Sequence, residues 1–203
     1  EIYTLSLHDA LPIFDYVGYG PFMGCESLQK INYYGSLDNW MKSMTGYSLS
    51  ITYAFGNDSG GIDTKHSEIS FFLDDSETET TSITYGDVWI QDYRFYNCTN
   101  LEKVYLTCDG ASIGYYAFAY CKSLNHVSLP DICDIGANAF KGCASLTTLS
   151  IKSGCTGIGE GALYTPSLKT INYGGTKSQW RKINKSKLYF GSVVHCSDGD
   201  LNY

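Results

Sequence analysis

Eight cysteines carry the most reactive side chains in this chain of 203 residues. Zinc and haem sites need Cys and His at short fixed spacings, and no C-x-x-C, H-E-x-x-H or C-x-x-C-H pattern occurs. His195 and Cys196, followed by Asp198, have the residue types of a thiol-protease set. Because neighbouring residues of a strand point to opposite faces of a sheet, this pair does not readily share one site. We therefore expect no metal, no cofactor and no catalytic residue.

Two segments look like ligand loops but are incomplete. GIGEGAL at 157–163 has the glycines of a dinucleotide-binding loop, but they belong to a short repeat that cannot supply the strand–helix–strand unit around such a loop. Asp198-Gly-Asp200 is too short for a calcium loop, which ends in a distal Glu. Neither segment predicts a ligand site.

The composition excludes several classes of function. The net charge of −7 argues against a nucleic-acid-binding surface. No apolar run approaches the roughly eighteen residues of a membrane-spanning helix. With 18 Tyr and 9 Phe, the chain is too aromatic to be disordered. We expect a folded, turn-rich protein.

A repeat of 22–23 residues organises the chain. Segments 90–106, 113–129 and 135–151 align without gaps, 158–173 follows with one deletion, and a partial unit occupies 17–33. The L-x-x-V-x-L end of each unit alternates as a half-buried strand does. The period leaves no room for a full crossover helix, so each coil must return through a short strand and turns. Such coils bury a continuous core only by stacking, which predicts a solenoid.

The apolar positions of the repeat form five columns that we expect to point inward. These columns are Ile90, Ile113, Ile135, Ile158; Phe95, Phe118, Phe140, Leu163; Leu101, Leu124, Leu146, Leu168; Val104, Val127, Leu149, Ile171; and Leu106, Leu129, Ile151, Tyr173. The glycines that follow the repeated Ile (Gly114, Gly136 and Gly159) are expected to adopt a positive φ, because the chain reverses direction there.

Four of the cysteines obey the repeat. Cys25, Cys98, Cys121 and Cys143 occupy one position, and Cys155 replaces an apolar residue. Stacked coils place equivalent Cα atoms about 4.8 Å apart with parallel side chains, which suits a ladder of buried thiols better than a disulfide. The positions outside this rule, where any disulfide is expected, are Cys108, Cys133 and Cys196.

The pattern I-G-x-x-A-F-x-x-C-x-S-L-x-x-[VL]-x-[LI] resembles the BspA-type class of bacterial leucine-rich repeats over 17–44 and 88–183. The resemblance implies a mainly β, right-handed leucine-rich-repeat solenoid with stacked parallel strands and short turns or helices. Family members are mostly secreted or surface-displayed, and some act as adhesins. The chain departs from the commoner L-x-x-L-x-L-x-x-N/C-x-L form, since no Asn/Cys ladder follows the strands.

Residues 1–13, EIYTLSLHDALPI, resemble the translation of a common DNA-sequencing adapter at all thirteen positions. We expect this segment to be non-native and exclude it from the fold prediction. We also expect that the native start is missing and that further repeats of the same chain lie upstream.

A second duplication relates 31–44 to 171–184, with Trp40 and Trp180 at equivalent positions. Trp180 and Ile183 have the spacing of one face of a short helix, which could cover the solenoid edge. We therefore predict that 14–44 is the tail of a first array and 88–203 a second array, each with a closing Trp element. Between them, 45–87 is a non-repeat segment with strands at YSLSITYAF and EISFFL, and SVVHC forms a final strand before the turn SDGD.

With no catalytic or metal site predicted, the outward-facing residues of the predicted parallel sheet are the candidate binding surface. The candidate binding residues are Lys103, Tyr105, His126, Ser128, Thr148, Ser150 and Lys152. We expect a non-enzymatic scaffold, secreted or on a cell surface, that binds a protein or glycan through this face. The alternatives are an accessory targeting module of a larger extracellular enzyme and a structural spacer without a specific ligand. Neither nucleic acid nor membrane insertion is expected.

Overall fold

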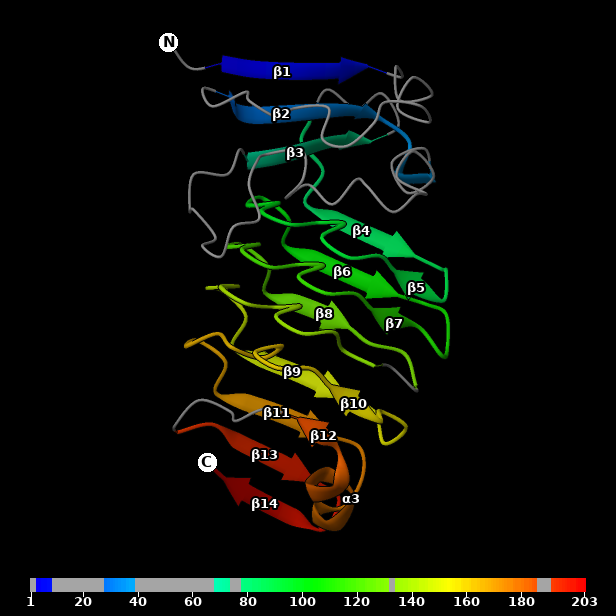
Figure 1. The fold of residues 1–203 in the computed structure, drawn as a ribbon, viewed down its shortest axis with the longest axis vertical. Coiled ribbons are helices and arrows are strands. Elements are labelled where there is room, and N and C mark those ends of the chain that lie inside the picture. The colour runs from blue at the N-terminus through cyan, green and yellow to red at the C-terminus, as the bar shows by residue number, and fades with distance from the viewer. Residues whose placement is uncertain (1–2, 9–27, 39–67, 74–77, 132–133, 186–190) are drawn as a thin grey trace.

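The computed structural model describes residues 3–8, 28–38, 68–73, 78–131, 134–185 and 191–203. Consecutive coils are stacked along the long axis of the molecule, from the N-terminal end at the top of Figure 1 to the C-terminal end at the bottom. Each coil contributes one strand to a front row and most contribute a shorter strand to a second row behind it. The molecule is a mainly β solenoid of stacked parallel strands, which confirms the predicted fold class.

The front row consists of two hydrogen-bonded sheets. The first has the order β4-β6-β8 and the second the order β14-β13-β11-β9. Their strands are β4 (Ser82–Tyr85), β6 (Lys103–Leu106), β8 (His126–Ser128), β9 (Thr148–Ile151), β11 (Thr170–Tyr173), β13 (Val193–Cys196) and β14 (Gly199–Asn202). All pairs are parallel except β13 with β14.

The second row consists of short strand pairs joined by single bridges. β5 pairs with β7 and β10 pairs with β12, all in parallel. These strands are β5 (Trp89–Ile90), β7 (Ser112–Ile113), β10 (Gly157–Ile158) and β12 (Asn184–Lys185). Single bridges join Ile113 to Ile135 and Ile135 to Ile158, so the repeated isoleucines lie in one line.

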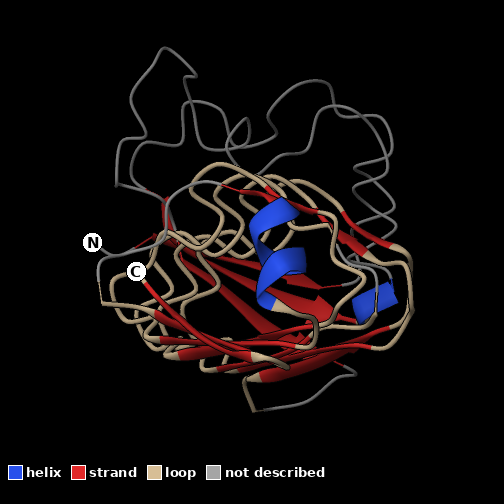
Figure 2. Ribbon diagram, turned by 90° about the horizontal axis from the view of Figure 1, so that it is seen from below, coloured by secondary structure: helices blue, strands red, loops and turns tan. Residues whose placement is uncertain are grey.

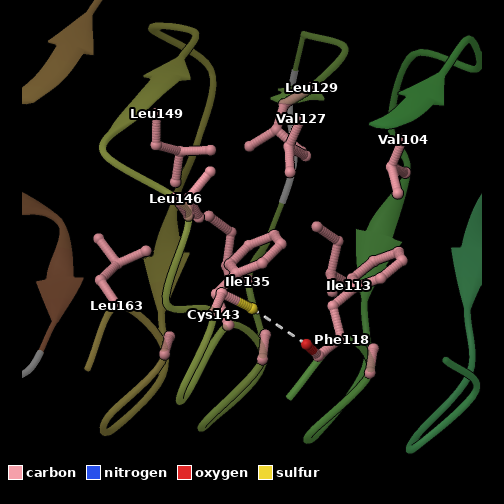
Figure 3. Packing of buried hydrophobic residues seen from close by; sticks show 14 of the residues in the cluster. Val104, Ile113, Phe118, Val127, Leu129, Ile135, Cys143, Leu146, Leu149 and Leu163 are labelled. Carbon is pink, nitrogen blue, oxygen red and sulfur yellow. Dashed lines mark hydrogen bonds between the residues drawn. The ribbon is translucent and has the colours of Figure 1, made fainter. Parts of the chain in front are cut away.

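The core lies between the two rows of strands and follows the predicted columns. Every residue of the five apolar columns is buried and belongs to one continuous cluster. Phe118 stacks between Phe95 and Phe140, with ring centroids 5.2 and 5.7 Å apart and nearly parallel planes. Figure 3 shows these layers of side chains pointing into the interior from successive coils. Each coil buries its apolar side chains against those of its neighbours, and this burial stabilises the stack.

The prediction for the repeated glycines is wrong in its physical reason. Gly114, Gly136 and Gly159 do not have a positive φ. A Cβ at each would instead meet backbone atoms of the preceding coil, at 2.4 Å from the amide nitrogen of Ala137 in the case of Gly159. These glycines are needed because the coils approach one another closely, and the left-handed residues lie two positions later.

A separate three-stranded sheet at the N-terminal end has the order β1-β2-β3. It contains β1 (Tyr3–His8), β2 (Leu28–Gly35) and β3 (Glu68–Leu73), all paired in parallel. An alternating segment such as β1 can pair with any open parallel edge through its backbone, so this pairing agrees with either origin of residues 1–13. The adapter origin stays a prediction.

The described part of segment 45–87 contains the two strands β3 and β4. β3 coincides with the predicted strand EISFFL, whereas the other predicted strand, YSLSITYAF, lies outside the described residues. β4 pairs with β6 in the same register that β6 has with β8, so the parallel stack begins before residue 88. The division of the chain into two arrays stays a prediction.

Helix α3 (Lys177–Lys182) covers the C-terminal end of the stack, as Figure 2 shows from below. A capping box starts the helix, since the Thr176 hydroxyl accepts from the Gln179 amide and the Gln179 side chain accepts from the Thr176 amide. Trp180 is fully buried and its indole N–H donates to the Tyr203 hydroxyl at 2.9 Å. The predicted short helix with a buried Trp180 is therefore confirmed, whereas Ile183 is a buried C-cap just past the helix end and Trp40 lies outside the described residues.

Candidate binding face

The front row presents the predicted binding residues on one outward face. Within β6 and β8, Lys103 lies beside His126 and Tyr105 beside Ser128. Within β9 and β11, Thr148 lies beside Thr170 and Ser150 beside Asn172. Their strand neighbours, such as Val104 and Leu149, point into the core because side chains alternate along a strand.

Exposure differs among these residues. Tyr105 and Ser128 are half-buried, and the others are exposed: Lys103, His126, Thr148, Ser150 and Lys152. Lys152 follows the end of β9 and lies against Gly174 of the next coil, where a Cβ would come within 3.6 Å of the Lys152 Cα. Lys152 therefore lies at the edge of the face, beyond the strand ends.

Two of the predicted residues, Tyr105 and His126, are in ring contact. Their rings come from adjacent strands and lie 5.1 Å apart with planes tilted by 46°. Lys103 is directly opposite His126 in the strand register. The structure thus brings an aromatic pair and an ammonium group together on a surface otherwise rich in hydroxyl side chains.

The face continues beyond the predicted residues onto β13 and β14. Asn172 lies beside His195, whose Nδ1 is 2.8 Å from the Asp200 carboxylate. The sequence did not predict Asp200 at this face, because β14 lacks the alternating apolar pattern from which a strand is recognised. Both side chains are about half exposed, so this contact contributes little to stability.

The three residues of the apparent thiol-protease set do not form one site. The exposed His195 pairs with Asp200, whereas Cys196 packs against the core cluster. Asp198 accepts from the backbone amide of Lys177 at 2.7 Å and so satisfies a free N–H in the first turn of α3. The arrangement closes the solenoid end.

The repeated cysteines are free, buried thiols. Cys98, Cys121 and Cys143 lie in one column, and the thiols of Cys121 and Cys143 donate to carbonyl oxygens of the preceding coil at 3.0 and 3.1 Å. Figure 3 marks the second of these bonds, from Cys143 to Phe118. Burial raises the pKa of Cys98 and Cys143 well above the usual thiol value, and that of Cys155 to about 11. The predicted thiol ladder is confirmed for these coils.

The other cysteines do not form a disulfide among the described residues. Cys108 and Cys196 are free, and Cys25 and Cys133 lie outside the part of the chain that the structure describes. Within that part, no three His, Cys, Asp or Glu side chains come together as a metal site would require. Likewise, the helices of the described residues include none with the length and apolarity to cross a membrane.

The comparison with protein families matches residues 70–191 to the BspA type leucine rich repeat region, in six copies. This match covers more than half of the chain. The chain belongs to the BspA-type leucine-rich-repeat family. The matched range includes the parallel-paired strands β4, β6, β8, β9 and β11 of the front row.

Two further comparisons add little to this BspA-type assignment. No curated protein matches the sequence. A crystal structure of a leucine rich cell surface protein from Faecalibacterium prausnitzii A2-165 is similar, with 19% identity and a TM-score of 0.49. The similarity covers 93% of this chain and 64% of that protein, so this chain spans less than two thirds of its length.

Proposed function

We propose that this BspA-type repeat chain is a non-enzymatic scaffold that is secreted or displayed on a cell surface. It binds a protein or glycan through the outward face of its front row. The membership of the family supports a repeat scaffold at the cell surface, where such repeats are mostly found. Parallel coils present side chains at fixed spacings on an extended face, which is how repeat proteins in general recognise partners.

The observation that carries the proposal is the contact between Tyr105 and His126. Two aromatic rings 5.1 Å apart, with Lys103 beside them, provide ring surface, hydrogen-bond donors and a cation in one place. Tyrosine is enriched among residues that dominate binding energies, because its ring is large and rigid and its hydroxyl can hydrogen-bond. The surrounding Ser and Thr hydroxyls can donate to and accept from a polar ligand.

The test is binding of the purified chain to an array of glycans and to a panel of immobilised extracellular-matrix proteins. The double variant Tyr105→Ser/His126→Ser removes both rings from exposed or half-exposed positions and should leave the unfolding midpoint nearly unchanged. A matched control, Thr148→Ser/Ser150→Thr, keeps the hydroxyls of the same face. We expect the ring variant to lose at least ten-fold in affinity for any ligand that the wild-type chain binds, and the control to keep it.

The alternatives give different results in the same assay. If the chain is a structural spacer, neither the wild-type protein nor the ring variant would bind a glycan or matrix protein above background. A targeting module of a larger enzyme would bind through the same face, but a polysaccharide that the enzyme degrades would be the preferred ligand. Binding that survives the loss of both rings would contradict the front row as the binding face.

A further inference from the structure

Five tyrosines form a second cluster, separate from the core, at the corner of two successive coils. We call this set the tyrosine cluster; its members are Tyr93, Tyr96, Tyr115, Tyr116 and Tyr120. They lie in the turns after β5 and β7, so they are on a different part of the coil from the front row. Tyr96 and Tyr116 are buried, Tyr93 and Tyr120 are half-buried, and Tyr115 is 40% exposed.

The rings of the cluster contact one another closely. Tyr93 and Tyr116 stack with centroids 5.2 Å apart, and Tyr115 stands on edge to both, at 5.4 Å from Tyr93 and 4.3 Å from Tyr116. Tyr96 and Tyr120 form a further edge-to-face pair at 5.4 Å. Packing from several sides holds Tyr115 at the surface in one place, which favours binding because little side-chain freedom is lost.

The backbone shows that the tyrosines are not the easiest residues at these positions. Tyr93 and Tyr116 have φ of 57° and 53°, a left-handed conformation that is unfavourable for bulky residues. The next two coils have the same conformation at this position but use Asn138 and Gly161, which tolerate it better. Among the described coils, the two with the cluster are the ones that keep aromatic side chains there, and strained residues of this kind concentrate at functional sites.

The surroundings of the cluster are suited to a positive charge. The ammonium group of Lys141 lies 5.6 Å from the centroid of the Tyr116 ring, so the cluster already accepts one cation–π contact. The Asp92 carboxylate is next to Tyr115, whose backbone N–H donates to it at 2.7 Å. Ala137 occupies the repeat position of Tyr115 in the next coil, and the exposed Glu160 occupies it one coil further on.

We propose that the tyrosine cluster binds a basic segment of a partner protein, with an Arg or Lys side chain of that segment on the exposed ring of Tyr115 and beside the carboxylate of Asp92. The chain's net charge of −7 favours encounter with such a segment. The proposal concerns a second site and does not depend on binding by the front row.

The test uses fluorescence anisotropy of a labelled peptide with alternating Arg and Gly, titrated with the chain at low and physiological salt. Asp92→Asn removes the charge but keeps an oxygen that can accept from Tyr115. Its matched control is Asp109→Asn, because Asp109 accepts from the Asp131 amide of the next coil at 3.2 Å in the same manner. Tyr115→Leu removes the aromatic ring but keeps an apolar side chain, and Tyr115→Phe keeps the ring face. Tyr105→Leu removes a ring from the front row.

We expect Asp92→Asn and Tyr115→Leu each to weaken peptide binding by about two- to five-fold, the range of a single exposed cation–π or ion-pair contact. Tyr115→Phe, Asp109→Asn and Tyr105→Leu should bind as the wild-type chain does. Equal loss with Asp92→Asn and Asp109→Asn would show only general attraction between opposite charges and would overturn the proposal. Loss with Tyr105→Leu but not with Tyr115→Leu would move the peptide to the front row, and unchanged binding by all variants would leave the cluster a packing feature alone.

Discussion

The interior of the coils and the corner that carries the tyrosine cluster share one period but use it differently. In the interior, the residue type stays almost constant from coil to coil, as in the stack of Phe95, Phe118 and Phe140. At the corner, the backbone stays constant while the residue changes from Tyr116 to Asn138 to Gly161. The repeat therefore determines the backbone conformation in both regions. It determines the residue type only in the interior, where side chains of neighbouring coils pack against one another.

The largest effect is expected in the interior, from Phe118→Ala. The ring is fully buried and packs against a ring on either side, so its removal leaves a cavity between two coils. The free energy of unfolding should fall by about 3–5 kcal/mol in urea titrations. A loss below about 1 kcal/mol would show that the coils are not packed as the structure describes.

Gly159→Ala should have the next largest effect, since it tests the close approach of adjacent coils. The new methyl group would meet backbone atoms of Ala137, which cannot move aside as a flexible side chain could. We expect a loss of about 2–3 kcal/mol in the same titrations. Gly110→Ala is a useful control, because a Cβ there meets nothing within 4 Å and the substitution strains only the backbone at φ 80°.

Gly142→Ala tests the corner and should cost less, about 1–2 kcal/mol. Gly142 has φ 73°, and a Cβ there would lie 2.7 Å from a ring carbon of Tyr120. Because a ring can shift, the double variant Tyr120→Ala/Gly142→Ala should recover the part of the loss due to the contact and keep the part due to φ. Strict additivity of the two substitutions would contradict this contact.

The smallest effect concerns pH and the thiol column. The pKa of Cys155 is about 11 and burial raises those of Cys98 and Cys143 as well, whereas thiols of the unfolded chain titrate near pH 8.5. Above that pH the unfolded chain loses protons that the folded chain keeps, so stability falls as pH rises. At pH 9.5 we expect the Cys155 thiol to account for a loss of about 1 kcal/mol relative to pH 7.

The contribution of one thiol to this pH dependence can be isolated with Cys155→Val. Cys155 occupies a position that is apolar in the preceding coil, so Val should pack there. The variant should lose less stability between pH 7 and 9.5 than the wild-type chain. An identical pH dependence would mean that Cys155 titrates alike in the folded and unfolded states.

The sequence could predict the interior because identical residues recur at identical spacings. The Leu101 column, the thiol column and the Trp180 cap all follow from such matches and are confirmed. The reason for the repeated glycines was mistaken, because spacing marks a requirement for Gly without distinguishing positive φ from close contact. Gly159 shows the second of these causes.

Two features of the surface could not be predicted because they do not follow the repeat. Asp200 lies on a short polar strand whose antiparallel pairing depends on the turn before it. The tyrosine cluster involves two coils, so in an alignment of the four repeat units its residues cannot be told from ordinary sequence variation. Folding brings Tyr93 and Tyr116 together through register, which the composition does not reveal.

Labelling of the native chain with iodoacetamide, followed by mass spectrometry of its peptides, tests the stack of coils most directly. The structure predicts that the partly exposed Cys108 is modified, while Cys98, Cys121 and Cys143 stay protected until urea unfolds the chain. The three should then become reactive together, since they line one cooperative core. Modification of Cys121 and Cys143 at the rate of Cys108 in the absence of urea would contradict the account.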